Sequence, residues 1–270
     1  MKYFIIKIYL FFKYLFQIII LRIKFERNTK IQFHLNKRYL ILLPHADDEL
    51  IGCDQLLKSN NISLLVNMDM SGGDTPEMHR LRYNELKLYS DSCKRTLITL
   101  RENKAHHLID IIKDFKPDFI CIPSCFDWHP EHYQVMAYLS EAFSFLGKSK
   151  DYILIAMYQV SVPLHPNYIN FAVPMTKEAY RNKWGNFVKY YKTQLHLPIR
   201  RFRANERING KLVGAYAAEC YIVMTVQEWK KVFEIAFTLD MAVDLKNNIN
   251  DLVEVRKKVA SYYKSCFLNK

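Results

Sequence analysis

The stretch YLILLPHADDE, residues 39–49, passes from an apolar run directly into a cluster of histidine and acidic residues. Its first five residues, Tyr39–Leu43, include no charged side chain, which is typical of a strand buried on both faces of a sheet. Polar residues that follow such a strand lie at its carboxyl end, where open α/β sheets bind their ligands. The stretch therefore predicts both a central strand and a functional loop.

Short apolar runs alternate with longer amphipathic segments through the first 160 residues or so. The apolar runs predict buried strands and the amphipathic segments predict helices. This alternation favours an α/β fold, a Rossmann-like, mostly parallel sheet with helices on both faces. The expected strands are Tyr39–Leu43, Ser63–Met68, Phe119–Ile122 and Tyr152–Met157, and the expected helices are Pro76–Cys93, Ala105–Phe115 and Tyr133–Phe145.

The second half of the chain has helical patterns in Lys177–Gln194 and in Gln227–Tyr263. Between them we expect an irregular stretch with two strands, Lys211–Gly214 and Glu219–Thr225. The chain thus divides into an N-terminal segment, a central domain and a C-terminal helical segment, residues 1–30, 38–225 and 226–270. The C-terminal segment can be a packing helix, a dimerisation face or a second membrane contact, and the pattern does not rank these.

Composition limits the class of protein. The 270 residues are 50% hydrophobic, enough to bury the core of one large domain. A net charge of +12 favours an anionic partner, which can be nucleic acid, anionic lipid or a phosphorylated substrate. Nucleic acid is not expected, because the basic run Arg200–Arg203 is short and no nucleic-acid-binding motif accompanies it. The six cysteines form no CxxC pair, which is typical of reduced thiols in a cytoplasmic protein.

A second cluster of histidine and acidic residues, Asp127–His132, follows the apolar run Phe119–Ile122. Each cluster alone has an ordinary explanation. Asp47 and Asp48 can cap a helix that begins near Glu49, and two histidines around a proline can decorate the start of another helix. Both clusters, however, follow expected strands, so that their loops should meet at one edge of the sheet. Their joint occurrence predicts a metal site.

Zinc in a catalytic site takes about three protein ligands and leaves a position open for water. His45 and Asp48 from the first loop and His132 from the second provide such a set. Zinc lowers the pKa of its water to roughly 7, and iron(II) can use the same nitrogen and oxygen ligands. Asp47, adjacent to a ligand, is then free to act as the general base.

The remaining polar residues of the second loop have roles around His129. This histidine lies three positions before the ligand His132 and can face the substrate, where it can stabilise an oxyanion and protonate a leaving amine. Glu131 or Asp127 can hold the ring of His129 in the correct tautomer and keep it charged. Together these groups fill every role that amide hydrolysis requires.

The two clusters resemble the signatures of the LmbE-like, PIG-L-type de-N-acetylases, zinc hydrolases that remove acetyl groups from N-acetylglucosamine conjugates. The signature PHPDDE corresponds to Pro44–Glu49 and the signature HPDH to His129–His132. The resemblance implies the same ligands, base and acid as the chemistry above. Two positions depart from the family pattern. Ala46 replaces a proline without loss of a functional group, and Glu131 replaces an aspartate, which puts the orientation of His129 in doubt.

Weaker similarity extends over residues 38–225. Residues 69–73 look like the family's glycine-containing loop, and the segments around Arg82, Tyr158 and Glu219 look like family segments near the substrate. Arg82 can bind a hydroxyl or phosphate, although an ion pair with Glu85, three residues along a helix, explains it equally well. Trp128 can stack on a sugar ring, or it can pack behind its loop. The expected substrate-binding residues are Arg82, Trp128, Tyr158 and Glu219.

The N-terminal segment is strongly apolar but interrupted by charges. On a helical wheel Lys2, Lys13, Gln17 and Lys24 share one face, with phenylalanine, isoleucine and leucine opposite. This pattern favours a helix that lies in the membrane interface, next to anionic headgroups. A single-pass anchor, a core helix and a signal peptide are alternatives, although no small-residue cleavage site follows. We therefore expect a cytoplasmic protein that is peripheral to the membrane.

These observations converge on a metal-dependent hydrolase. The expected reaction is the zinc-dependent removal of an acetyl group from an N-acetyl amino sugar in a glycan or glycolipid precursor. One alternative is a zinc amidase that acts on a soluble amino-sugar conjugate, such as a small thiol or an antibiotic precursor. A non-enzymatic, membrane-associated sugar-binding protein is the other.

Overall fold

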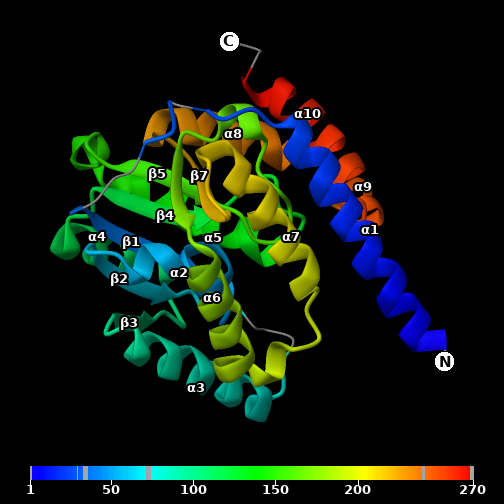
Figure 1. The fold of residues 1–270 in the computed structure, drawn as a ribbon. Helices are drawn as coiled ribbons and strands as arrows, with labels where there is room; N and C mark the ends of the chain where they lie inside the picture. Colours follow the sequence, from blue (N-terminus) through cyan, green and yellow to red (C-terminus); the bar gives the residue numbers. More distant parts are fainter. Residues whose placement is uncertain (1, 29, 33–35, 71–73, 239–240, 268–270) are drawn as a thin grey trace.

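A computed structural model describes residues 2–28, 30–32, 36–70, 74–238 and 241–267. Its centre is a sheet of seven strands in the order β3-β2-β1-β4-β5-β7-β6 (Figure 1). The strands β1 to β5 pair in parallel, and β7 runs antiparallel to both β5 and β6. The strands are β1 Arg38–Leu43, β2 Ile62–Asn67, β3 Thr96–Thr99, β4 Phe119–Pro123, β5 Leu154–Tyr158, β6 Phe171–Met175 and β7 Ala217–Thr225.

Helices cover both faces of this sheet, which confirms the expected α/β architecture (Figure 1). One core contains side chains of α2, α3 and α6, and the other contains side chains of α4, α5, α8, α9 and α10. Strand β1 contributes to both, because Leu40 and Leu42 face one core while Ile41 and Leu43 face the other. The helices are α1 Lys2–Lys24, α2 Asp48–Lys58, α3 Pro76–Ser92, α4 Lys104–Phe115, α5 Pro130–Phe145, α6 Lys177–Tyr190, α7 Ile199–Asn209, α8 Val226–Thr238, α9 Ala242–Asn248 and α10 Leu252–Phe267.

One expected strand is wrong. Lys211–Gly214 falls mostly in the 3₁₀ turn η4, Gly210–Val213, which reverses the chain before β7. Gly210 lies so close to the backbone of Ala217 that an added Cβ would stand 2.6 Å from its Cα, and Gly214 has a φ of 69°. The segment therefore forms a tight turn that only glycine accommodates at both positions, and its two apolar residues reflect packing, not strand pairing.

Three elements were not expected from the sequence. Strand β3 lies at one edge of the sheet and is only partly buried, and β6 lies at the other edge. The helix α7 occupies the stretch that we expected to be irregular. The C-terminal pattern also resolves into three helices, α8 to α10, which pack on the sheet and on one another. Of the glycine-containing loop, residues 71–73 lie outside the described residues.

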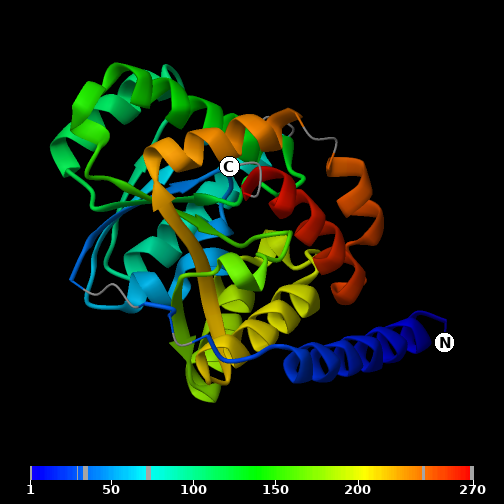
Figure 2. The ribbon, with the colours of Figure 1, turned by 90° about the horizontal axis from the view of Figure 1, so that it is seen from above.

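The N-terminal helix α1 lies along the surface of the body, against α7 and α10 (Figures 1 and 2). Of the α1 side chains whose burial is described, residue 9 and residues 11–24, those of Tyr14, Gln17 and Leu21 are buried. Gln17, which we expected on the solvent-facing polar side, donates a hydrogen bond to Asp251 (3.0 Å). Among the described residues, none of the helices combines the length and the apolar character needed to cross a bilayer.

Candidate active site

The first loop leads from β1 into α2 and carries three acidic residues in succession. Asp47 stands at the N-cap of α2 with a φ of 123°, a strained backbone conformation that is uncommon outside glycine. Its side chain makes no capping hydrogen bond. Asp48 points back into the loop, where it accepts a hydrogen bond from the backbone N–H of His45 (3.0 Å). The carboxylates are therefore not used as helix caps, and the strain at Asp47 serves to position side chains.

The second loop leads from β4 into α5. His129 is the N-cap of α5, and Pro130 occupies the first helical turn, which suits the fixed φ of proline. Asp127 is buried and accepts hydrogen bonds from the backbone N–H groups of His129 (3.2 Å) and Ser161 (2.9 Å). These bonds fix the loop, so that His132, one turn into α5, faces the first loop.

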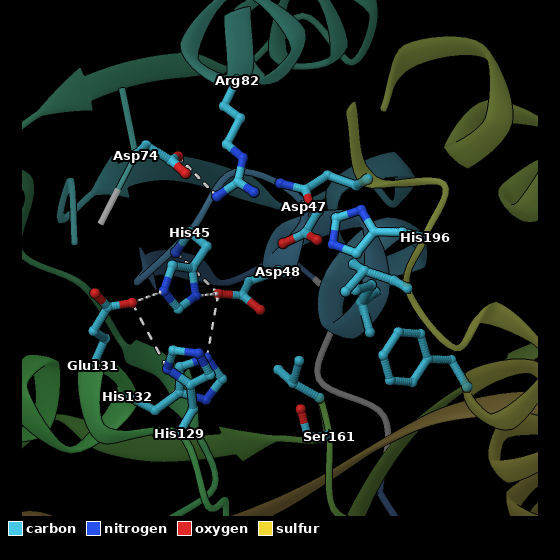
Figure 3. A pocket seen from close by; sticks show the side chains of 15 residues that line it. His45, Asp47, Asp48, Asp74, Arg82, His129, Glu131, His132, Ser161 and His196 are labelled. Carbon is cyan, nitrogen blue, oxygen red and sulfur yellow. Dashed lines mark hydrogen bonds and ion pairs between the residues drawn. The ribbon is translucent and has the colours of Figure 1, made fainter. Parts of the chain in front are cut away.

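The two loops meet because β1 and β4 are parallel neighbours in the sheet. Asp48 Oδ2 lies 3.4 Å from His45 Nδ1 and 3.7 Å from His132 Nε2, and the side chains of all three converge (Figure 3). The ligand atoms of a tetrahedral zinc ion lie roughly 3.4 Å apart, given bonds of about 2.1 Å. The spacing of this nitrogen and oxygen donor set therefore fits zinc.

The second nitrogen of each predicted histidine ligand faces a carboxylate. His45 Nε2 contacts Glu131, and His132 Nδ1 lies 3.6 Å from Asp127 Oδ2. Metal-ligating histidines characteristically have such partners, which fix the tautomer and orient the ring. We expected Glu131 or Asp127 to hold His129 instead. Glu131 lies 3.7 Å from His129 Nδ1, whereas Asp127 contacts His129 only through the backbone.

His129 lies beside the predicted ligands. One ligand atom from each of His45, His129 and His132 can be chosen so that all lie within 4.8 Å of one another. A set of three histidines is therefore a second way to hold an ion here. The predicted set is supported by the distances from Asp48 to His45 and His132, 3.4 Å and 3.7 Å, which are near tetrahedral ligand spacing.

Electrostatics in the site reflects burial and close charges. Burial and the neighbouring Asp48 carboxylate raise the pKa of Asp47 well above its usual value. Burial lowers the pKa of His45, but hydrogen bonds to Asp48 and Glu131 outweigh it and raise that pKa to about 10. Burial and the two other histidines lower the pKa of His129. Without a bound cation, the cluster therefore holds a proton on His45, where a metal ion would compete with it.

A pocket of about 390 Å³ opens beside these residues. Asp47, His45 and His129 line one side, and Arg82 and His196 line it from other elements (Figure 3). Arg82 lies in the pocket as expected. Its ion pair is with Asp74 (2.8 Å), because Glu85 instead accepts hydrogen bonds from Thr193.

Three of the four expected substrate-binding residues do not line the pocket. Tyr158 is fully buried and donates a hydrogen bond to the carbonyl of Leu42 (2.8 Å). Glu219 is buried at the other end of α2, against Lys183. Trp128 lies beneath the guanidinium of Arg201, whose carbon is 5.4 Å from the ring centre, so the packing interpretation holds for it. In this structure Tyr158 and Glu219 therefore occupy buried positions in the core, and all three side chains lie outside the pocket lining.

The pocket also has residues that the sequence did not point to. Gln194, His196 and Phe202 come from the segment between α6 and α7 and from α7 itself. Asp74 and Ser161 come from loops after β2 and β5. A single histidine or serine in a loop without a motif carries no recognisable signal, and only the fold brings these residues to the site.

No family model matches the chain, and no curated protein matches it in sequence. Solved structures do match it. N,N'-diacetylchitobiose deacetylase from Pyrococcus horikoshii aligns with a TM-score of 0.58 at 17% identity, over 72% of this chain and 85% of that chain. Teicoplanin deacetylase Orf2, in a zinc-inhibited form, aligns with a TM-score of 0.52 at 14% identity, over 70% and 98%. The A40926 pseudoaglycone deacetylase Dbv21 gives 0.52 at 14%, over 71% and 98%.

These matches show that the chain has the fold of these deacetylases. The resemblance drawn from the two sequence signatures is thereby confirmed at the level of the fold. The aligned part leaves more than a quarter of this chain without a counterpart in the three neighbours.

Proposed function

We propose that this chain, which has the fold of sugar and glycopeptide deacetylases, is a zinc-dependent hydrolase that removes an acetyl group from an N-acetyl amino sugar. The observation that carries the proposal is that Asp48 Oδ2 lies 3.4 Å from His45 Nδ1 and 3.7 Å from His132 Nε2, with Asp47 beside them in a pocket. A carboxylate base next to a metal-ligand set is the arrangement that amide hydrolysis needs.

The chemistry follows from the residues around the pocket. His45, Asp48 and His132 would hold the zinc ion, which would supply polarisation of the acetyl carbonyl and a water whose pKa is lowered to roughly 7. Asp47 removes a proton as the water oxygen bonds to the carbonyl carbon. His129, half-buried at the pocket edge, donates a hydrogen bond to the oxygen that becomes negative. Cleavage of the C–N bond then releases acetate, and the proton held by Asp47 passes to the amine nitrogen.

The pocket supports a polar, sugar-like substrate. Arg82 and Asp74 form an ion pair on the wall opposite the second loop, and His196 and Ser161 add hydrogen-bonding groups. Such groups can bind hydroxyls around a ring, while the reacting amide lies against Asp47. We propose a glycan or glycolipid precursor that carries an N-acetylglucosamine-type sugar as the substrate.

A second candidate substrate is a soluble amino-sugar conjugate of the antibiotic type. It is favoured by one observation, that two of the neighbouring structures are deacetylases named for teicoplanin and the A40926 pseudoaglycone. The polar lining of the pocket suits this class as well. The two substrate classes share the sugar and differ in what it is attached to.

Acetate release tests the proposal. Purified protein loaded with zinc is incubated with N-acetylglucosamine linked to a lipid, to an oligosaccharide and to a glycopeptide, and acetate is measured. Release from at least one conjugate is expected, with the lipid-linked or oligosaccharide form preferred. The same conjugates, incubated with zinc but without protein, are the control for background hydrolysis. If the zinc-loaded protein releases no more acetate than this control from any conjugate, the chain is not a deacetylase, and a sugar-binding role takes precedence.

A further inference from the structure

The helix α1 is attached to the body by its polar face. Gln17 donates to Asp251 and accepts from the backbone N–H of Leu252 (3.2 Å), and Lys13 lies 3.8 Å from the Asp251 carboxylate. Tyr14 donates a hydrogen bond to Asn250 (3.2 Å). In most surface helices the apolar stripe faces the core and the polar face meets water. In α1 the buried side is mixed, because Leu21 also packs there against Ile208, and a second apolar face points outward.

The opposite face of α1 consists of large apolar side chains that nothing in the described chain covers. Phe12 is 61% exposed, Phe16 is 64% exposed and Ile23 is 78% exposed. With Ile19, half exposed, they follow a spacing of four, three and four residues, so they form one stripe along the helix. A contiguous apolar stripe of this length marks an interaction surface. Further exposed residues on either side are Tyr9, Phe11 and Leu15.

Basic residues lie at the C-terminal end of this stripe. The last turn of α1 contains Arg22 and Lys24, and no acidic residue lies in its first turn. A cavity of about 530 Å³ at this end is lined by Lys24, Arg27 and His165, with Glu26 as its one acidic residue. Among the described residues, no ion pair holds Lys24 or Arg27. An apolar stripe that ends in uncompensated cations is complementary to an anionic lipid surface.

We propose that the outward face of α1, defined by Phe12, Phe16, Ile19 and Ile23, docks on an anionic membrane. The helix lies in the plane of the interface, with these side chains among the acyl chains and Lys24 and Arg27 at lipid phosphates. A spanning orientation would remove Lys13 and Gln17 from Asp251. Pairing with α1 of a second copy is disfavoured, because an isologous contact along the stripe would bury two helices that carry basic and no acidic charge.

The helix α7 links α1 to the pocket. Ile208 and Ala204 of α7 pack with Tyr14 and Leu21 of α1, and Phe202 of the same helix lines the pocket. Two helices, α1 and α7, therefore lie between the membrane face and the site, and the axes of packed helices lie roughly 10 Å apart. We extend the proposal to a substrate held at the membrane, and that extension rests on the proposed function. The docking itself does not.

Vesicle binding of the full-length protein tests the docking without any measure of activity. The protein is sedimented with vesicles of phosphatidylcholine alone and with vesicles that contain phosphatidylserine. Strong binding to the anionic vesicles is expected. The variant Phe12→Ser/Phe16→Ser/Ile23→Ser should bind them at least tenfold more weakly, and Lys24→Gln/Arg27→Gln should lose about fivefold for each charge removed.

A matched control removes equally exposed apolar residues from elsewhere. Leu88, Phe145 and Val188 are 60%, 71% and 54% exposed and lie on α3, α5 and α6. Their triple serine variant should bind vesicles as the wild type does. Light scattering of all variants, with circular dichroism, checks that each is folded and reports self-association. The proposal is overturned if the wild type does not bind anionic vesicles, if both triple variants bind equally, or if the α1 variant only converts a dimer into a monomer.

Discussion

Two buried clusters of charged side chains contact α2 in this protein. In one, which we call the open cluster, the carboxylates face a pocket; in the other, the closed cluster, they are paired with a buried lysine. At the N-terminal end of α2, Asp47 and Asp48 face a pocket. Farther along, Lys183 is fully buried and lies 2.5 Å from Glu206 and 2.7 Å from Glu219. Lys183 also donates to the backbone carbonyl of Ile51 in α2 (2.8 Å).

The difference separates a structural cluster from a functional one. In the Lys183 cluster, the lysine supplies a cation to both carboxylates, and all three side chains are buried. In the site cluster the cations beside Asp48 are imidazoles, whose outer nitrogens already face Glu131 and Asp127, and Arg82 is paired with Asp74. Buried carboxylates without a fixed cation suit a metal ion. Similar composition can therefore stabilise a fold in one place and bind an ion in another.

The largest expected effect is a loss of catalytic rate on substitution of one residue in the open cluster. Asp47→Asn should lower kcat by roughly 10³-fold or more, because the amide cannot accept a proton from water. Zinc content should stay at the wild-type level, since Asp47 is not in the predicted ligand set. Acetate release and metal analysis measure both, with the exposed Asp91→Asn as control. An Asn variant as active as the wild type would show that Asp47 is not the base.

The next largest effect is a loss of stability when the lysine of the closed cluster is removed. Lys183→Met should destabilise the protein by about 3–5 kcal/mol, because two carboxylates remain buried without a cation. Denaturant unfolding measures the loss, and Lys189→Met, an exposed lysine on the same helix, is the control. A change below about 1 kcal/mol would mean that water reaches the carboxylates.

The loss of stability in Lys183→Met should depend on pH. Burial raises the pKa of Glu219 to about 7 even though Lys183 lowers it, so removal of the lysine raises this pKa further. A group whose pKa is raised on folding contributes stability at low pH and loses it as the pH rises through the folded-state pKa. The deficit of Lys183→Met relative to the wild type should therefore be smallest near pH 4.5 and grow toward pH 8. A deficit that is constant across this range would contradict the account.

A smaller effect concerns the open cluster, where bound zinc should stabilise the folded protein. Zinc at about 100 times its dissociation constant should stabilise the wild type by about 2.7 kcal/mol, because the folded state alone has the assembled site. Thermal unfolding with zinc and with a chelator measures this gain. Asp47→Asn should keep the gain. Equal stability of the wild type in zinc and in chelator would argue against an assembled metal site.

The smallest effect concerns Tyr158, which lies near both clusters and belongs to neither. Tyr158→Phe removes its hydrogen bond to Leu42 and should cost about 1 kcal/mol, with kcat and KM unchanged. Unfolding and acetate assays on one preparation test this together. A raised KM with unchanged stability would restore Tyr158 as a substrate-binding residue.

The central strands and the two loops could be predicted because their signals are local. Strand β1 is a continuous apolar run buried on both faces, and histidines and carboxylates directly follow β1 and β4. Edge strands lack such signals. Thr96–Thr99 is only partly buried, and its pairing with β2 depends on partners about 30 residues away. The turn after α7 contains apolar residues that imitate a strand.

Side-chain direction was the other quantity that the sequence could not supply. The helical wheel of α1 correctly separated a polar from an apolar face, but only the position of Asp251 decides that the polar face turns inward. Likewise, Glu131 or Asp127 was expected to hold His129. Glu131 lies near His129 but also contacts His45, and the side chain of Asp127 faces His132. His196 reaches the pocket through a loop without a motif. The sequence pattern shows which side of a helix is polar and which is apolar. Which residues a side chain contacts depends on the assembled fold.

Zinc stoichiometry tests the central claim, that the loops after β1 and β4 hold a single ion, most directly. Protein stripped with chelator is titrated with zinc and followed by calorimetry, for the wild type and for His132→Ala, with the exposed His106→Ala as control. One tightly bound zinc per chain in the wild type and the control, and none in His132→Ala, is the predicted result. No tight site in the wild type, or an unchanged site in His132→Ala, would contradict the account.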